Sequence, residues 1–112
     1  MKPNIEFSDF QKIEIRVGTI ISCSRVEGSN KLLKLEVDLG ELGERQILAG
    51  ISAWFEPDEL IGLQTTFVVN MQPRTIMGLE SQGMLFAMDA GDEGKPEFLI
   101  PRGEVPNGTL AI

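Results

Sequence analysis

The chain has 112 residues, of which 42% are hydrophobic, a length and composition that fit one globular domain and argue against a disordered chain. No apolar run reaches the roughly 18 residues of a membrane span, and the N-terminus lacks the apolar stretch of a signal peptide, so we expect a cytoplasmic protein with no membrane partner. The sequence has no histidine, no tyrosine and one cysteine, which removes the commonest general base and metal ligand, intrachain disulfides and cysteine-cluster metal sites.

The formal net charge is −7, which disfavours nucleic acid as a ligand. Residues 1–40 contain six acidic and six basic side chains, whereas residues 41–112 contain eleven acidic and four basic ones. Folding can still gather the basic side chains on one face. The alternative is an ordinary acidic protein that its charge keeps in solution.

In chain order, residues 7–12 are expected to form one helical turn with Ser8 as its cap. Apolar and polar residues then alternate from 13 to 23, which predicts a long half-buried strand, and Gly18 indicates a bulge or bend in it. Its expected inward side chains are Ile13, Ile15, Val17, Thr19, Ile21 and Cys23. After a loop at 27–30 a second strand is expected, with inward side chains Leu33, Leu35, Val37 and Leu39.

A turn at 40–44 leads to a third expected strand at 45–51. Residues 52–60 are expected to form one or two helical turns, with a short helix from Pro57. Further strands are expected at 64–70, 84–88 and 98–100, with an irregular stretch at 71–83 and a turn at 91–94. Five or six short strands fit a sandwich or an SH3-type barrel as well, but the helix between the third and fourth strands favours an all-β, five-stranded barrel of the oligonucleotide/oligosaccharide-binding (OB) type.

Three groups of polar residues are candidates for binding. Asn30, Lys31 and Lys34 surround the start of the second strand, where amines and an amide can hold phosphates and a base edge. Ser81, Gln82 and Met84 lie where a loop enters a strand, and a hydroxyl and an amide can read a base while the thioether packs on it. Arg74, after the fourth strand, can reach a phosphate. Taken singly, each group also fits solvated lysines, a polar turn or a core methionine.

No residue set predicts catalysis, a metal site or a cofactor. The carboxylate pairs Asp58–Glu59 and Asp92–Glu93 adjoin a helix start and a turn, where acidic residues are favoured for local reasons. Residues 89–94 lack the ligand spacing of a calcium loop.

Several segments together resemble a known family. They are NKLLKLEVDLG at 30–40, AGI at 49–51, PDELIG at 57–62, VNMQPR at 69–74 and MGLESQGM at 77–84, and residues 7–18 and 105–108 fit the same pattern. This combination, which covers essentially residues 1–112 as one domain, is similar to the tRNA-binding domain appended to methionyl-tRNA synthetases, also found as a free-standing structure-specific tRNA-binding protein.

The resemblance implies an OB barrel with additional C-terminal strands that pair two copies into a homodimer. The apolar residues at 98–112, which a lone barrel does not need, agree with that dimer. It also implies non-catalytic binding to the outer corner of the L-shaped tRNA by shape, with an aminoacyl-tRNA synthetase as a further partner. By position, the implied tRNA contacts are Asn30, Lys31, Lys34, Arg45, Arg74, Ser81, Gln82 and Met84.

A related branch of the same fold is the CsaA-type secretion chaperone, whose clients are unfolded or exported polypeptides. The acidic charge and an adaptable methionine set favour that alternative, although the methionines also fit core filling. The set comprises Met71, Met77, Met84 and Met88. The sequence SQGM at 81–84 favours the tRNA-binding branch.

Overall fold

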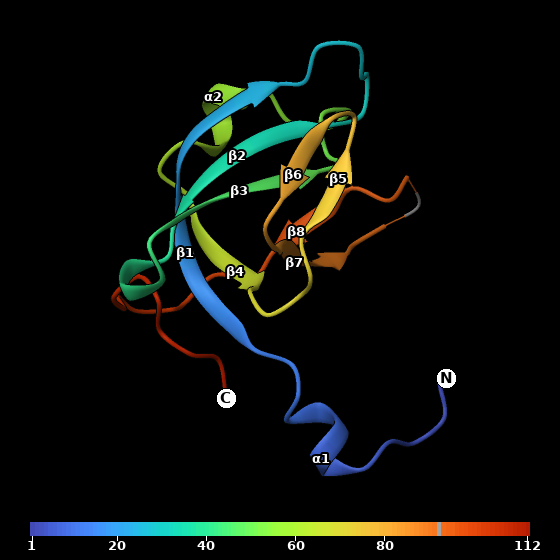
Figure 1. The fold of residues 1–112 in the computed structure, drawn as a ribbon, viewed down its shortest axis with the longest axis vertical. Helices are drawn as coiled ribbons and strands as arrows, with labels where there is room; N and C mark the ends of the chain where they lie inside the picture. Colours follow the sequence, from blue (N-terminus) through green and yellow to red (C-terminus); the bar gives the residue numbers. More distant parts are fainter. Residues whose placement is uncertain (92) are drawn as a thin grey trace.

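The computed structural model describes residues 1–91 and 93–112 as strands joined by short helical turns (Figure 1). Its elements are α1 (Phe7–Phe10), β1 (Ile15–Arg25), β2 (Leu33–Asp38), the 3-10 turn η1 (Gly40–Leu42), β3 (Glu44–Ala49), α2 (Pro57–Leu60), β4 (Gln64–Val68), β5 (Arg74–Ile76), β6 (Leu79–Ser81), β7 (Met84–Asp89) and β8 (Pro96–Phe98). The predicted all-β fold with a helix between the third and fourth strands is confirmed.

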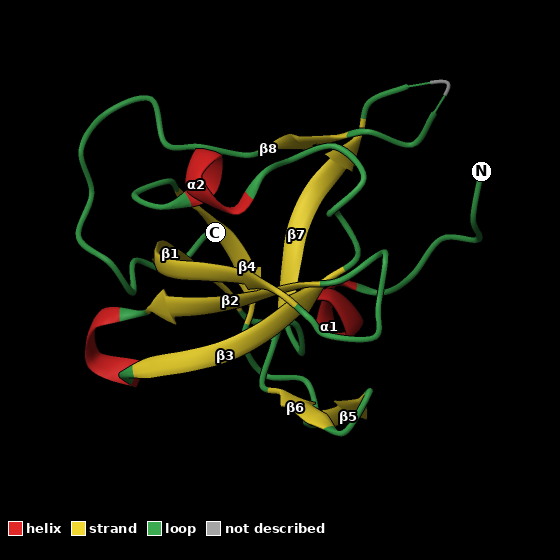
Figure 2. Cartoon of the chain, turned by 90° about the horizontal axis from the view of Figure 1, so that it is seen from above, coloured by secondary structure: helices red, strands yellow, loops and turns green. Residues whose placement is uncertain are grey.

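One antiparallel sheet has the strand order β3–β2–β1–β4–β7–β8, and β5 and β6 form a separate two-stranded ribbon beside it (Figure 2). The core lies on the inner face of the large sheet. Its fully buried apolar side chains are Ile20, Leu33, Leu35, Val37, Leu39, Ile47 and Phe67. Each such side chain stabilises the fold by about 1.5–3 kcal/mol relative to an exposed position.

The alternation predicted for β2 is confirmed. The alternation predicted for β1 is wrong at Thr19, which pairs with outward Asp38, and at Ile21, but it is right at Cys23, which packs against the core. Ile20 is fully buried opposite Val37, and Ile21 is 43% exposed. The pairing with β2 then slips between Ile20 and Ser22, and this one extra residue brings Cys23 opposite buried Leu35. The bulge therefore lies beyond Gly18. Gly18 instead permits close packing, since a Cβ there would lie 2.6 Å from Val37 Cγ1.

β1 changes partners along one edge. Its residues 19–25 pair with β2, while Ile15 and Val17 bond on the same edge to the C-terminal segment at 108–111. The N–H of Val17 donates to Thr109 O at 2.9 Å, and the N–H of Gly108 donates to Val17 O at 2.7 Å. The red C-terminal trace therefore runs beside the lower half of β1 in Figure 1.

The stretch at 71–83, predicted to be irregular, contains the β5–β6 hairpin. Ile76 pairs with Leu79, so only Met77 and Gly78 form the turn. Their φ angles are 53° and 78°, the pattern of a type I′ turn, whose twist suits a tight hairpin.

Both short helices were expected, but Ser8 does not cap the first. α1 begins at Phe7, with Ser8 inside it, and the N–H of Glu6 donates to Asp9 Oδ2 at 3.3 Å. α2 begins with Pro57 as predicted and buries Leu60. No helix in the described residues is long and apolar enough to cross a membrane. At the turn predicted for 91–94, the N–H of Gly94 donates to Gly91 O, and Asp92 lies outside the described residues.

Candidate nucleic-acid interface

The loop between β1 and β2 holds Asn30 and Lys31 with their backbone fixed and their side chains exposed. Ser52, which is buried, donates from Oγ to Asn30 O at 2.9 Å and from its N–H to Lys31 O at 3.1 Å. Ser29 Oγ accepts from the N–H of Lys31 at 3.2 Å. Hydrogen bonds with Ser29 and Ser52 therefore fix the loop backbone and leave the amide of Asn30 and the amine of Lys31 available to a ligand.

Lys34 lies on the outer face of β2, in register with Ser24 of β1 and Leu48 of β3. Its side chain borders a hollow of about 340 Å³, which we call the hairpin hollow, between the end of β1 and the tip of the β5–β6 hairpin. The hollow is lined by Arg25, Val26, Glu27, Lys34, Met77 and Leu79. Lys34 and the exposed loop of Asn30 and Lys31 thus belong to one end of β2.

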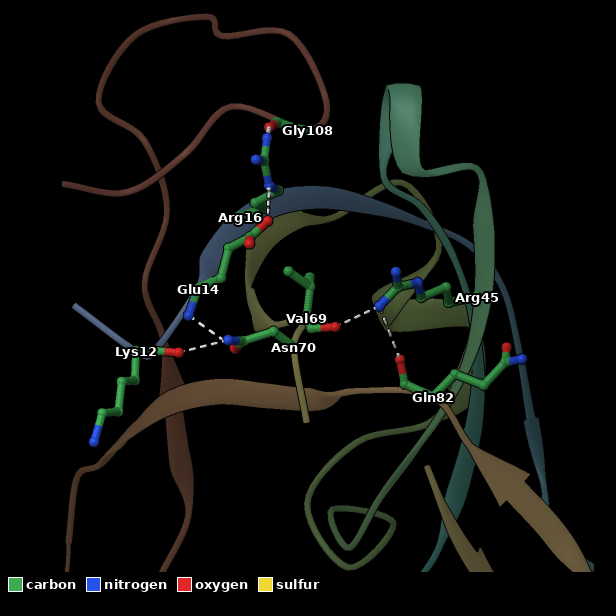
Figure 3. Close-up of polar contacts among 8 residues, drawn as sticks. All are labelled: Lys12, Glu14, Arg16, Arg45, Val69, Asn70, Gln82 and Gly108. Carbon is green, nitrogen blue, oxygen red and sulfur yellow. Dashed lines mark hydrogen bonds and ion pairs between the residues drawn. The ribbon is translucent and has the colours of Figure 1, made fainter. Parts of the chain in front are cut away.

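Arg45 lies on the opposite face of the sheet from Lys34. It pairs with Val37, whose side chain is in the core, so the guanidinium of Arg45 points inward. Figure 3 shows its Nη1 donating to the carbonyl oxygens of Val69 and Gln82. The part-buried guanidinium is therefore occupied within the protein.

Ser81 and Gln82 connect the hairpin to the edge of β3. The N–H of Leu48 donates to Ser81 Oγ at 3.0 Å, and this hydroxyl donates to Gly83 O at 3.1 Å. Gln82 accepts from the N–H of Gln46 at 3.0 Å through Oε1 and donates its own N–H to Gln46 O at 2.8 Å. We call these contacts, with the bonds of Arg45, the β3 seam. Ser81 is only 5% exposed, so its hydroxyl serves the seam.

Arg74 and Met84 lie outside both groups. Arg74 is exposed on β5, opposite Ser81 in the hairpin. Met84 begins β7, is 40% exposed and borders an apolar groove of about 400 Å³ together with Phe10, Ile13 and Phe86. The structure therefore brings together Asn30, Lys31 and Lys34, and it separates them from Arg45, Ser81, Gln82 and Met84.

Sequence reasoning overlooked Arg25 and Met77 as neighbours of Lys34. Arg25 is paired with Glu56 at 2.9 Å, and both side chains are largely exposed. Met77 reaches the hollow only because the β5–β6 hairpin folds beside the end of β1. The signal for that hairpin was Gly78, because a glycine between apolar residues supplies a positive φ that a two-residue turn requires.

The remaining titratable groups offer little chemistry. Burial raises the pKa of the Cys23 thiol, with a smaller opposing effect of Arg25 and a further increase from Asp58, so the thiol stays protonated at neutral pH. Within residues 1–91 and 93–112, no three cysteine or carboxylate side chains gather in a way that could hold a metal ion.

Comparisons with known proteins show the family and support the fold. A sequence model of the family described as "Putative tRNA binding domain" matches residues 15–110. The chain is 47% identical over 107 residues to a methionine–tRNA ligase of Methanothrix thermoacetophila, a match that covers 96% of the chain and 15% of the ligase. The chain thus spans only a small part of the curated relatives that it matches.

Two solved structures match over nearly the whole chain. A MetRS-related protein from Pyrococcus horikoshii has a TM-score of 0.90 and 34% identity, covering 99% of this chain and 100% of that one. The chaperone CsaA from Bacillus anthracis has a TM-score of 0.87 and 32% identity, covering 98% and 100%.

Proposed function

Because the chain belongs to the tRNA-binding domain family, we propose that residues 1–112 act as one non-catalytic domain that binds the outer corner of tRNA by shape. The observation that carries the proposal is the β1–β2 loop, whose backbone is fixed by Ser52 while Asn30 and Lys31 project outward. A loop held in this way loses little conformational freedom on binding.

The distribution of charge supports the same site in spite of the net charge of −7. Lys31, Lys34 and Arg74 make no ion pair among the described residues, whereas Lys12, Arg16 and Arg25 each pair with a carboxylate. Lys31 and Lys34 at one end of β2, and Arg74 on the separate β5–β6 ribbon, can hold phosphates of a folded RNA, and each phosphate contact releases counterions. We propose Asn30, Lys31, Lys34 and Arg74 as the direct contacts, with Arg45, Ser81 and Gln82 supporting them through the β3 seam and Met84 at the margin.

Homodimerisation is the second part of the proposal. α1 buries none of its residues, and Phe7 is 72% exposed, so this four-residue helix has little to stabilise it within its own chain. Phe7, Phe10 and Ile13 border an open groove of about 400 Å³ together with Leu110 and Ile112. A second copy that covers this apolar surface would give a dimer of about 25 kDa from 12.3-kDa chains.

Sedimentation at micromolar concentration tests the dimer. We expect a dimer for the unaltered chain and a monomer for Phe10→Asp, which places a charge in the groove that Phe7, Phe10 and Ile13 form with the C-terminal residues. A monomeric unaltered chain would contradict this part of the proposal.

The tRNA proposal is tested by gel shift with bulk tRNA at two salt concentrations, with an unfolded polypeptide as competitor. We expect tRNA to bind at low salt, to weaken at high salt and to resist the competitor. No tRNA binding even at low salt, with binding of the polypeptide, would favour the alternative. A cytoplasmic aminoacyl-tRNA synthetase is the proposed partner, since the family's sequence also occurs in methionine–tRNA ligases.

Polypeptide binding is the second candidate function, favoured by the likeness to the chaperone CsaA. A groove of about 300 Å³ between β3 and β7, lined among others by Leu48, Met84 and Met88, offers an adaptable apolar surface for a polypeptide. Leu48 in this groove pairs with Lys34, so the groove adjoins the proposed tRNA site and the competition described above tests which ligand is bound there.

A further inference from the structure

Met77, at the tip of the β5–β6 hairpin, has an unfavourable backbone conformation for its residue type. Its φ is 53°, and among the described residues no other non-glycine residue has a positive φ. Type I′ turns favour Asn, Asp or Gly at this position, since a Cβ is crowded there. A methionine at residue 77 therefore does not stabilise the turn, and a role of its side chain is the reason to look for.

The side chain of Met77 lies where a ligand can reach it. It is 56% exposed and borders the hairpin hollow with Lys34 and Arg25. On its inner side, its Cε would lie 3.5 Å from a Cβ added to Gly28, so the thioether spans from the hairpin tip to the β1–β2 loop. A flexible, polarisable apolar group thus stands beside two cations.

We infer that Met77 is a further RNA-contacting residue, which packs its thioether on a nucleobase or ribose while Lys34 holds the adjoining phosphate. A nucleotide combines a flat face with an anion a few bonds away, and the hollow offers a matching pair of groups. Glu27 on the same rim repels phosphate, which places the anion on the side of Lys34. The inference rests on the proposed function, because it assigns a residue to the same site.

The test uses Met77→Asn in the full chain, because asparagine suits a positive φ and keeps the hairpin turn. We expect a melting temperature equal to or above that of the unaltered protein. We also expect the affinity for bulk tRNA to fall about three- to tenfold with an unchanged salt slope, since no charge is lost. Ile61→Asn, an equivalent change at another exposed apolar side chain outside the hollow, should leave the affinity unchanged.

A second measurement uses the unaltered protein, and a variant is needed only to assign the Met77 methyl signal. In protein labelled at the methionine methyl groups, the Met77 signal should move on addition of tRNA, because a base ring shifts the resonance of a methyl group packed on it. The Met1 methyl, at the exposed N-terminus, should not move.

The outcomes are distinct. Unchanged affinity of Met77→Asn, or an immobile Met77 signal while tRNA binds, overturns the inference and leaves the proposed function standing. Loss of melting temperature together with affinity assigns Met77 to packing against the β1–β2 loop and also overturns it. If the unaltered protein binds no tRNA at low salt, the proposed function and the inference both fail.

Discussion

The β1–β2 loop and the β3 seam contain the same kinds of polar side chain, but the fold uses them in opposite ways. In the loop, backbone groups of Asn30 and Lys31 are bonded to Ser52, and the side chains are left to solvent. In the seam, the side chains themselves make the bonds, since Arg45, Ser81 and Gln82 all contact backbone atoms across a strand edge. A side chain bonded to the backbone of another segment contributes to stability, whereas an unbonded side chain on a fixed backbone is available for binding.

This comparison predicts that seam variants lose stability and that loop variants lose affinity. The largest effect is expected for Arg45→Met, which keeps an apolar stem but removes the donor to the carbonyl oxygen of buried Val69. An unsatisfied buried carbonyl should lower the free energy of unfolding by about 3 kcal/mol, or the melting temperature by roughly 10 °C or more. Thermal melting measures the loss. If the variant is stable but binds tRNA more weakly and with less dependence on salt, Arg45 contacts the RNA and does not serve the seam.

Ser81→Ala should have the next largest effect, because the N–H of Leu48 loses its acceptor inside the seam. We expect a loss of about 2 kcal/mol in unfolding free energy, measured by urea titration. Ser24→Ala, at an exposed serine of β1, is the matched control and should stay within about 0.5 kcal/mol. Equal losses at both positions would contradict a stabilising role of the Ser81 hydroxyl in the seam.

Lys34→Ala should leave stability nearly unchanged and lower tRNA affinity about tenfold, with the salt slope smaller by about one unit. The slope distinguishes a lost phosphate contact from a distorted site. The control is Lys95→Ala, since Lys95 lies over the ring of Phe55 at 5.6 Å, away from the loop. If both changes weaken binding equally, the attraction is a general charge effect.

Ser52→Ala should have the smallest effect, because it loosens the loop without removing a charge. Asn30 O is near solvent and can bond to water instead, so we expect about a threefold weaker affinity at an unchanged salt slope. A tenfold loss with a smaller slope would show that Ser52 itself is near the RNA.

The sequence predicts the core side of β2 well, because its apolar and polar residues alternate strictly. The same rule would have placed Arg45: it lies two residues before Ile47, which is fully buried, so alternation directs it inward. The family resemblance implies tRNA contacts at both Arg45 and Lys34, but alternation places their side chains on opposite faces of the sheet.

Other parts of the fold could not be predicted from the alternation of apolar and polar residues. The exposure of Ile21 depends on a slip in the pairing of β1 with β2, and the sequence of one strand does not show the register of its partner. The bonds of Ser81 depend on where the hairpin docks on β3. The site was thus predictable as a set of residue types, but their division into loop and seam is a property of tertiary contacts.

The change of partner along β1 also has a consequence for synthesis of the chain. Half of this strand's edge is completed by residues 108–111, and Arg16 bonds to Gly108 across 92 residues (Figure 3). On the ribosome, the first long strand to emerge therefore keeps an open edge until every other strand has been made. Contacts of such separation slow folding, and an open edge invites pairing with other chains. The nascent chain is most exposed to misassembly in the interval before its last residues appear.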